Sequence, residues 1–426
     1  MKPVIIIGGG VIGLCTAYSL RQRDIPVTVL DAGPAEQAAS HVNAGWIVPA
    51  MAEPVPAPGL IATSLRWMLR SDSPLFIDPR ALRDPAFLRW TLRFWQHCNR
   101  DSYRQGVHAL AAFGRRALPL YDAMRAAGVT YEEHRDGIIY AYRSPVSMER
   151  DYAGLETIRS YGYAVSPMLS GNILREMEPA LSETVQGGFL FPNERSIRPD
   201  SLVRGLSAYL RERGVEIRAA TPVSGIETTN GKATAVVTQG ARIPAETVVV
   251  AAGAWTGALL RPLRVDVPVV AGKGYSLDLS PQPVSPPVSS PLYLHETRVA
   301  VTPLNGMIRL AGTMEFSGLN HHLRPERIGA IASSAAWAIR GWPAVTPTSG
   351  PGISSWTGPR PMTPDGLPVI GWLPRYRGIA IASGHSMAGV GLAPVTGEAI
   401  AEMIATGTPP EGVAAFDPAR FTRVIG

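Results

Sequence analysis

The 426-residue sequence has only two cysteines, Cys15 and Cys98, and neither belongs to a C-x-x-C pair or another metal-binding spacing. This excludes a disulfide framework, leads us to expect no metal site, and is typical of a reducing compartment. Charged residues make up only 17% of the chain, against 46% hydrophobic residues. The composition therefore predicts a globular protein with a large core and excludes a disordered one.

Lysine is scarce as well, since Lys2, Lys232 and Lys273 are the only ones and arginine carries the remaining positive charge. The net charge of +6 is dispersed along the chain, without a basic run or an aromatic–basic RNA motif. We therefore expect no nucleic-acid partner.

Long hydrophobic runs are missing beyond residues 3–20, and that uncharged stretch is interrupted by four glycines. Glycine is unfavourable inside a helix, so a membrane span is not expected there. The sequence predicts a cytoplasmic protein and leaves open a peripheral contact with the inner face of the cytoplasmic membrane.

A glycine-rich loop follows the first apolar segment. The β-branched segment Val4–Ile7 predicts a buried parallel strand, and residues 8–13 match G-x-G-x-x-G. In this pattern Gly8 permits the turn, Gly10 admits a pyrophosphate and Gly13 lets the next helix pack closely. That helix, roughly residues 12–23, would direct N–H groups near Val11 and Ile12 at the phosphates. A second strand, residues 26–30, ends at Asp31, whose carboxylate is placed to bind ribose hydroxyls.

Five later segments extend the pattern over nearly the whole chain. They are residues 39–45 (ASHVNAG), 198–202 (RPDSL), 247–255 (TVVVAAGAW), 356–366 (WTGPRPMTPDG) and 384–391 (GHSMAGVG). In this order they resemble the D-amino-acid oxidase and dehydrogenase superfamily of FAD-dependent oxidoreductases, and most of all its D-amino-acid dehydrogenases of the small-subunit type.

The resemblance implies FAD, bound non-covalently, although some relatives tether flavin through a histidine in the region of His41. It assigns Ser40 and Asn43 to the pyrophosphate and Val223 to the adenine. The start of the helix after residue 388 would face the flavin pyrimidine. The further residues that it places beside FAD are Ala39, Ala44, Gly45, Trp46, Ile47, Ala252, Gly253, Trp255, Gly389, Val390, Gly391 and Leu392. The family usually has glutamate at the position of Asp31, so a longer or water-bridged ribose contact is expected.

On the substrate side, the resemblance implies that Arg360 binds the carboxylate of the amino acid. An arginine can do so through two charge-assisted hydrogen bonds. An ion pair between Arg360 and Asp365 is the alternative. Tyr275, in the segment KGYSL, is a candidate for closing over the substrate or for packing in the sheet. His295 is a candidate for tuning specificity, and no catalytic base is assigned.

The implied reaction is oxidative deamination of an amino acid, with D-amino acids as the leading class. Hydride passes from the α-carbon to flavin N5, and the imine hydrolyses to a keto acid and ammonia. A flavoprotein subunit of a heteromeric D-hydroxyproline or amine dehydrogenase, and an oxidase of glycine or N-methyl amino acids, stay open. Residues 309–315 lack the lysine with which some relatives activate oxygen, which favours a quinone or another acceptor.

Residues 61–104 combine tryptophan and phenylalanine with many arginines. This composition is typical of helices packed with snorkelled arginines, and also of a basic surface on an anionic membrane.

The expected architecture is α/β, with a Rossmann-like FAD-binding domain and a second α+β substrate domain built on an antiparallel sheet. We assign residues 1–58, 183–262 and 352–426 to the FAD-binding domain. Residues 59–182 and 263–351 are assigned to the substrate-binding domain.

Overall fold

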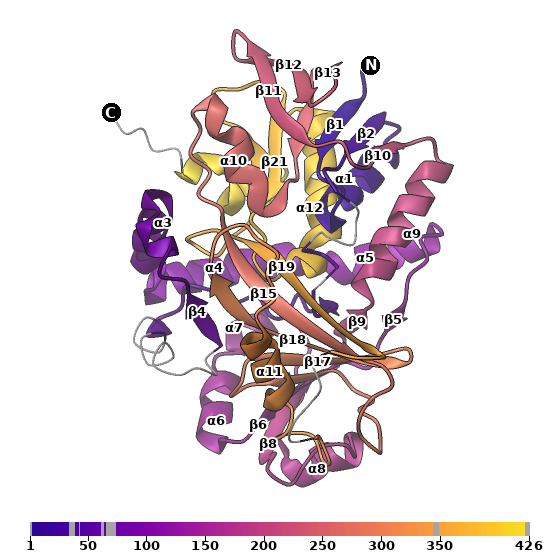
Figure 1. Cartoon of the computed structure of the whole chain (residues 1–426), viewed down its shortest axis with the longest axis vertical. Coiled ribbons are helices and arrows are strands. Elements are labelled where there is room, and N and C mark those ends of the chain that lie inside the picture. The colour runs from indigo at the N-terminus through magenta and orange to yellow at the C-terminus, as the bar shows by residue number, and fades with distance from the viewer. Residues whose placement is uncertain are drawn as a thin grey trace.

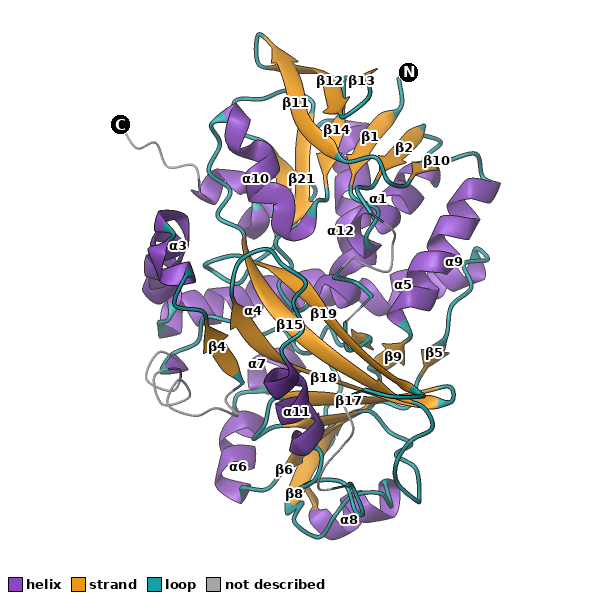
Figure 2. Ribbon diagram, in the orientation of Figure 1, coloured by secondary structure: helices purple, strands orange, loops and turns teal. Residues whose placement is uncertain are grey.

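The computed structural model describes residues 2–33, 39–41, 43–60, 64, 74–343 and 349–421. A smaller sheet lies at one end of the molecule, and the long strands of a larger sheet cross its middle and extend towards the other end (Figures 1 and 2). The N-terminal (indigo) and C-terminal (yellow) parts of the chain both contribute to the end that carries the smaller sheet (Figure 1). Within the described ranges, no helix has the length and apolar character to cross a membrane.

The smaller of these sheets has six strands in the order β10-β2-β1-β14-β21-β20. Its strands are β1 (Val4–Ile7), β2 (Val27–Leu30), β10 (Glu216–Arg218), β14 (Val248–Val250), β20 (Val369–Trp372) and β21 (Ile379–Ser383). All neighbours pair in parallel except β20 and β21. In β1, Val4 and Ile6 face one hydrophobic core and Ile5 and Ile7 face another. The predicted strand is thus covered on both faces, as parallel sheets usually are.

Helices cover one face of this sheet. They are α1 (Val11–Arg21), α9 (Pro199–Glu212) and α12 (Gly389–Thr406), and α5 (Ala117–Ala126) packs against α12. A Cβ at Gly397 of α12 would lie 2.5 Å from the carbonyl oxygen of Cys15, so α1 and α12 approach more closely than a side chain would allow. The other face carries α10 (Thr256–Leu260) and the small sheet of β11 (Val223–Thr229), β12 (Lys232–Thr238) and β13 (Arg242–Pro244).

The larger sheet has nine strands, in the order β19-β15-β18-β17-β16-β6-β8-β7, with β4 paired to β18. They are β4 (Leu75–Ile77), β6 (Ile138–Tyr142), β7 (Leu169–Ser170), β8 (Gly187–Phe191), β15 (Val270–Leu279), β16 (Leu292–Leu294), β17 (Val299–Leu304), β18 (Met307–Phe316) and β19 (Ile353–Met362). Neighbours are antiparallel apart from the pairs β16–β6 and β18–β4. Helix α11 (Pro325–Ser334) packs on one face of this sheet.

The remaining elements surround the two sheets. They are α3 (Pro85–His97), α4 (Arg100–Gly114), α6 (Pro145–Ala153), α7 (Glu156–Ser160) and α8 (Gly171–Met177), and a three-stranded sheet of β3 (Trp46–Ile47), β9 (Arg195–Ile197) and β5 (Glu133–His134).

Sheet membership departs from the predicted domain boundaries at two strands. Both β8 and β19 lie in the nine-stranded sheet, although residues 183–262 and 352–426 were assigned to the FAD-binding domain. Strand β19 pairs with β15 over ten residues, from Val270 opposite Met362 to Leu279 opposite Ile353. The other boundaries stay a prediction.

Candidate functional site

A cavity of about 1430 Å³ is lined by residues from both the six-stranded and the nine-stranded sheet. Pockets for small ligands usually measure roughly 300–1,000 Å³, so this space suits a dinucleotide together with a substrate. Most residues expected beside FAD line it: Gly8, Gly10, Val11, Ile12, Asp31, Ala39, Ser40, Asn43, Ala44, Trp46, Val223, Ala252, Gly253, Trp255, Gly389, Val390, Gly391 and Leu392. Gly13, Gly45 and Ile47 are not part of this lining.

The loop before α1 forms a cradle that side chains would fill. Gly8 has φ +115°, and a Cβ there would lie 2.3 Å from the carbonyl oxygen of Ala251. A Cβ at Gly13 would lie 1.9 Å from the carbonyl oxygen of Gly8, so α1 can approach the turn this closely only because residue 13 has no side chain. The Ser40 hydroxyl accepts a hydrogen bond of 3.1 Å from the Val11 N–H at the helix start. The backbone and the helix N-terminus thus fit a pyrophosphate.

Asp31 follows β2 directly and lines the cavity. Its carboxylate accepts hydrogen bonds from the N–H of Gly9 and, at 2.9 Å, from the N–H of Gly33. These bonds fix the carboxylate beside the glycine loop. Each oxygen keeps a further lone pair, with which it could accept a hydrogen bond from ribose.

A second helix, α12, also begins at the cavity. Its N-cap residue, Ala388, offers no capping side chain, so the first N–H groups of the helix have no partner from that source. Among the described residues, two buried polar atoms beside this helix start lack a hydrogen-bond partner, His385 Nδ1 and Ser386 Oγ. Uncapped N–H groups and a positive dipole end fit the electron-rich pyrimidine edge of a flavin.

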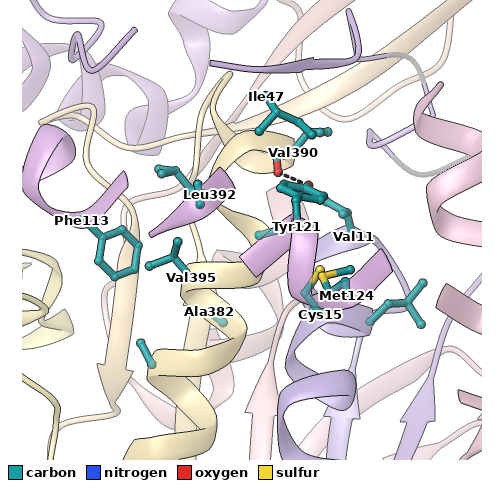
Figure 3. Close-up of a cluster of buried hydrophobic side chains, with 14 of the residues drawn as sticks. Val11, Cys15, Ile47, Phe113, Tyr121, Met124, Ala382, Val390, Leu392 and Val395 are labelled. Carbon is teal, nitrogen blue, oxygen red and sulfur yellow. Dashed lines mark hydrogen bonds between the residues drawn. The ribbon is translucent and has the colours of Figure 1, made fainter. Parts of the chain in front are cut away.

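The first turn of α12 is held from outside the helix. Pro394 lies inside the helix and has no N–H, so the Val390 carbonyl loses its usual partner four residues on. The hydroxyl of Tyr121, on α5, donates to this carbonyl at 2.6 Å, within a cluster of buried apolar side chains (Figure 3). The helix start therefore keeps its shape without the missing backbone bond.

Two residues of the larger sheet hold the loop of residues 39–46, and sequence reasoning missed both. Arg309 on β18, 2% exposed, pairs with Asp278 through two bonds of 2.7 Å. Its Nη1 donates to the carbonyl oxygens of His41 and Asn43 at 3.0 and 3.1 Å. The only signal was a charged residue within an apolar strand.

Thr302, on β17, is the second of these residues. Its hydroxyl donates to the Ala44 carbonyl at 2.8 Å and accepts from Trp46 Nε1 at 2.9 Å. The substrate-side sheet thereby positions a segment of the cofactor site.

Arg360 lies on β19 and lines the cavity. Its Nη1 donates to the Thr313 carbonyl at 2.7 Å, and its guanidinium covers Gly274, where a Cβ would lie 2.2 Å from Cζ. Burial lowers the pKa of Arg360 to about 10, so the group stays charged at neutral pH. No carboxylate of a described residue lies within ion-pair distance of it. A half-buried cation that faces the cavity without a counter-charge favours an anionic ligand.

The alternative pairing of Arg360 with Asp365 is wrong. Asp365 instead pairs with Arg420, with Nε to Oδ2 at 2.7 Å. Arg420 also donates to the carbonyls of Leu367 and Pro368, so this ion pair fastens the chain after β19.

The structure places Tyr275 away from the cavity. Its hydroxyl donates to Glu315 at 2.7 Å, and Glu315 also pairs with Lys273 at 2.9 Å. Side chains alternate along β15, so Gly274 faces Arg360 while Tyr275 packs in the cluster beneath α11. We therefore assign Tyr275 no substrate contact.

His295 lines a small cavity of about 30 Å³ beside the large one. Its Nδ1 lies 3.0 Å from Asp151 Oδ2, and its ring stacks on Tyr142 with centroids 4.5 Å apart. Burial, followed by the charge of Arg298, lowers the pKa of His295 to about 4. The ring is thus neutral at pH 7 and stands behind the residues that line the large cavity.

Comparisons with known proteins agree with this geometry. The profile of a family described as FAD dependent oxidoreductase matches residues 3–403. The chain is 32% identical over 419 residues to a D-amino acid dehydrogenase of Methylobacterium sp. (strain 4-46), covering 96% of each chain. Its fold is similar to glycine oxidase from Geobacillus kaustophilus, with TM-score 0.75, 22% identity and 99% of each chain covered. It is also similar to L-proline dehydrogenase from P. horikoshii, with TM-score 0.74, 18% identity and coverage of 99% and 98%. The chain belongs to the FAD-dependent oxidoreductase family, and FAD is its cofactor.

Proposed function

We propose that the protein oxidises the α-carbon of amino acids, with D-amino acids as its main class. The desolvated guanidinium of Arg360, unpaired among described carboxylates and open to the cofactor cavity, carries this proposal. The names of curated relatives that span almost the whole chain, D-amino acid dehydrogenase, support the substrate class.

The chain's own residues would bind and orient the substrate. FAD, when bound, accepts the two electrons and the hydrogen of the α-carbon. Arg360 would hold the carboxylate through charge-assisted hydrogen bonds, which fixes the α-carbon against the cofactor. The apolar walls around Trp46 and Met51 would exclude water from the site. The N-terminus of α12 would stabilise negative charge at the pyrimidine edge of the cofactor. The imine product needs only water to give a keto acid and ammonia.

Replacement of Arg360 tests the carboxylate contact. Arg360→Leu removes charge-assisted hydrogen bonding that contributes about 1.5–3 kcal/mol in total, so KM for amino acids should rise by a factor on the order of ten to a hundred. Gly274→Ala should raise KM in the same direction, because its Cβ would occupy the position of the guanidinium. Gly225→Ala is the matched control, since a Cβ there meets no atom within 4 Å. Unchanged KM in Arg360→Leu, with FAD bound normally, would contradict the assignment.

We further propose that electrons leave to a quinone at a membrane surface. Leu88, Leu92 and Trp95 of α3 follow one face of the helix and are 47%, 52% and 61% exposed, yet they also line the cavity. The opposite face of the helix packs Phe87 and Trp90 in a hydrophobic cluster. The apolar face is therefore continuous with the site, as a lipophilic acceptor requires.

Charge complementarity points to an anionic bilayer, because the side chains of Arg83, Arg89 and Arg100 are exposed around this helix. Much of residues 61–73, which belong to the arginine-rich, aromatic segment 61–104, lies outside the described residues.

Vesicle flotation tests this surface. The protein should float with phosphatidylglycerol vesicles at low salt, and the double change Leu92→Glu with Trp95→Glu should abolish flotation. Val146→Glu, at a 75% exposed residue of α6, is the matched control and should float normally. Wild-type protein that stays unbound at low salt would rule out the membrane contact.

A further inference from the structure

A second group of polar residues lines the cavity near Arg360. Glu53 follows β3, Arg298 precedes β17 and Tyr103 lies on α4, and all three belong to the cavity wall. A Cβ at Gly312 would lie 3.3 Å from the carbonyl oxygen of Arg298, so Arg298 borders the Gly312–Thr313 bend of β18. Because the Thr313 carbonyl accepts from Arg360, this group lies at the substrate end of the cavity.

The polar ends of Glu53 and Arg298 keep hydrogen-bonding groups that no described residue uses. Arg298 Nη1 contacts the Tyr293 hydroxyl at 3.3 Å, and neither Glu53 nor Arg298 forms an ion pair with another described residue. Both side chains are accessible from the cavity although protein surrounds them.

The environment also couples their charges. Burial raises the pKa of Glu53, and the charge of Arg298 counteracts that rise. Burial opposes the charge of Arg298, but Tyr293, Asp151 and Glu53 outweigh it, and the pKa of Arg298 is raised.

The backbone at Arg298 is unusual as well. Its φ is +56°, in the left-handed region that an arginine rarely adopts. Such conformations persist where the surrounding structure enforces them, and they cluster at ligand sites. Here the bend brings the arginine side chain to the cavity wall, directly before β17.

We propose that Glu53 and Arg298 form a side-chain subsite that selects amino acids bearing a hydroxyl group. A hydroxyl can donate to the Glu53 carboxylate and accept from the Arg298 guanidinium at the same time. A cationic side chain would pair with Glu53 but would be repelled by Arg298. An anionic side chain would pair with Arg298 but would be repelled by Glu53. This inference rests on the proposed function, because Arg360 must hold the α-carboxylate for the side chain to reach the subsite.

Isosteric substrate pairs test the subsite directly. D-Threonine and D-valine differ by a hydroxyl in place of a methyl group, as do D-serine and D-2-aminobutyrate. The FAD-loaded protein should show kcat/KM higher for the hydroxyl member of each pair by roughly ten- to a hundred-fold, because a polar subsite left unpaired penalises the methyl analogue. In Glu53→Leu and Arg298→Asn this ratio should fall towards one. Asparagine tolerates positive φ, and bound-flavin absorbance reports whether each variant is folded.

Each outcome has a distinct meaning. Amino acids that reduce the flavin without preference for the hydroxyl member, or with preference for acidic or basic side chains, would overturn the subsite alone. An unchanged ratio in both folded variants would do the same. Flavin that no amino acid reduces would overturn the proposed function and the subsite together.

Discussion

Arg360 and Gly274 show that one functional side chain depends on the absence of another. The guanidinium lies where a Cβ at position 274 would be, so the glycine creates its place. The motif around Arg360 could be recognised in the sequence. Its dependence on Gly274 could not, because the two residues meet only through the pairing of β15 with β19.

Glu194 is a buried carboxyl group whose ionisation destabilises the folded state. It is 3% exposed, its Oε1 accepts a 3.2 Å hydrogen bond from Ala50 N–H, and burial raises its pKa to about 8. An unfolded glutamate titrates near about 4.3, so the folded state binds the proton more tightly between these values. Stability contributed by this group is therefore present at low pH and lost as pH rises through that window.

Glu194→Gln removes this titration. The unfolding free energy of the variant relative to wild type should increase steadily from pH 5 to pH 8, by on the order of a few kcal/mol in total, and its relative melting temperature should rise in parallel. Thermal denaturation of the FAD-loaded proteins across this range measures the difference. Parallel pH profiles for the two proteins would show that the carboxylate is not the cause.

At the scale of elements, the sequence predicted the framework of the cofactor site well. The expected helix at roughly residues 12–23 is α1 (Val11–Arg21), and the strand after it is β2 (Val27–Leu30). These elements carry local signals, namely β-branched runs, glycine turns and helical periodicity. The face of a strand is less certain, because one residue of register reverses it, and Tyr275 faces α11 rather than the cavity for that reason.

Helix α12 supports a prediction at this scale. Tyr121→Phe would leave the Val390 carbonyl buried without its donor, at a cost of about 1–3 kcal/mol, which would lower the melting temperature by a few degrees. The FAD dissociation constant should rise, since the affected turn lines the cofactor cavity. Flavin fluorescence titration and thermal denaturation measure the two effects.

Tyr376→Phe is the matched control for this change. The Tyr376 hydroxyl donates to the Leu263 carbonyl at 2.8 Å, and neither residue is part of the cavity wall. This variant should lose some stability while its FAD affinity stays unchanged. Equal FAD affinity in Tyr121→Phe and Tyr376→Phe would refute the role given to Tyr121.

At the scale of the whole molecule, the nine-stranded sheet holds in place part of the wall of the cofactor cavity. Arg309 and Thr302 belong to the nine-stranded sheet, and both bind the loop of residues 39–46. Arg309 and His41 are separated by 268 residues along the chain. No local pattern in the sequence signals a contact of that kind. The contacts of Arg309 and Thr302, and the subsite at Glu53 and Arg298, could therefore be found only in the folded chain. The family and the cofactor, in contrast, could be predicted from ordered motifs.

The most direct test of the proposed function is anaerobic bleaching of the bound-flavin absorbance. The FAD-loaded protein is mixed with D- and L-enantiomers of the same amino acids, and with glycine, sarcosine and D-hydroxyproline, and is then exposed to air. We expect rapid bleaching by D-amino acids and slow recovery in air unless a quinone is added. FAD-loaded protein that none of these compounds bleaches would contradict it.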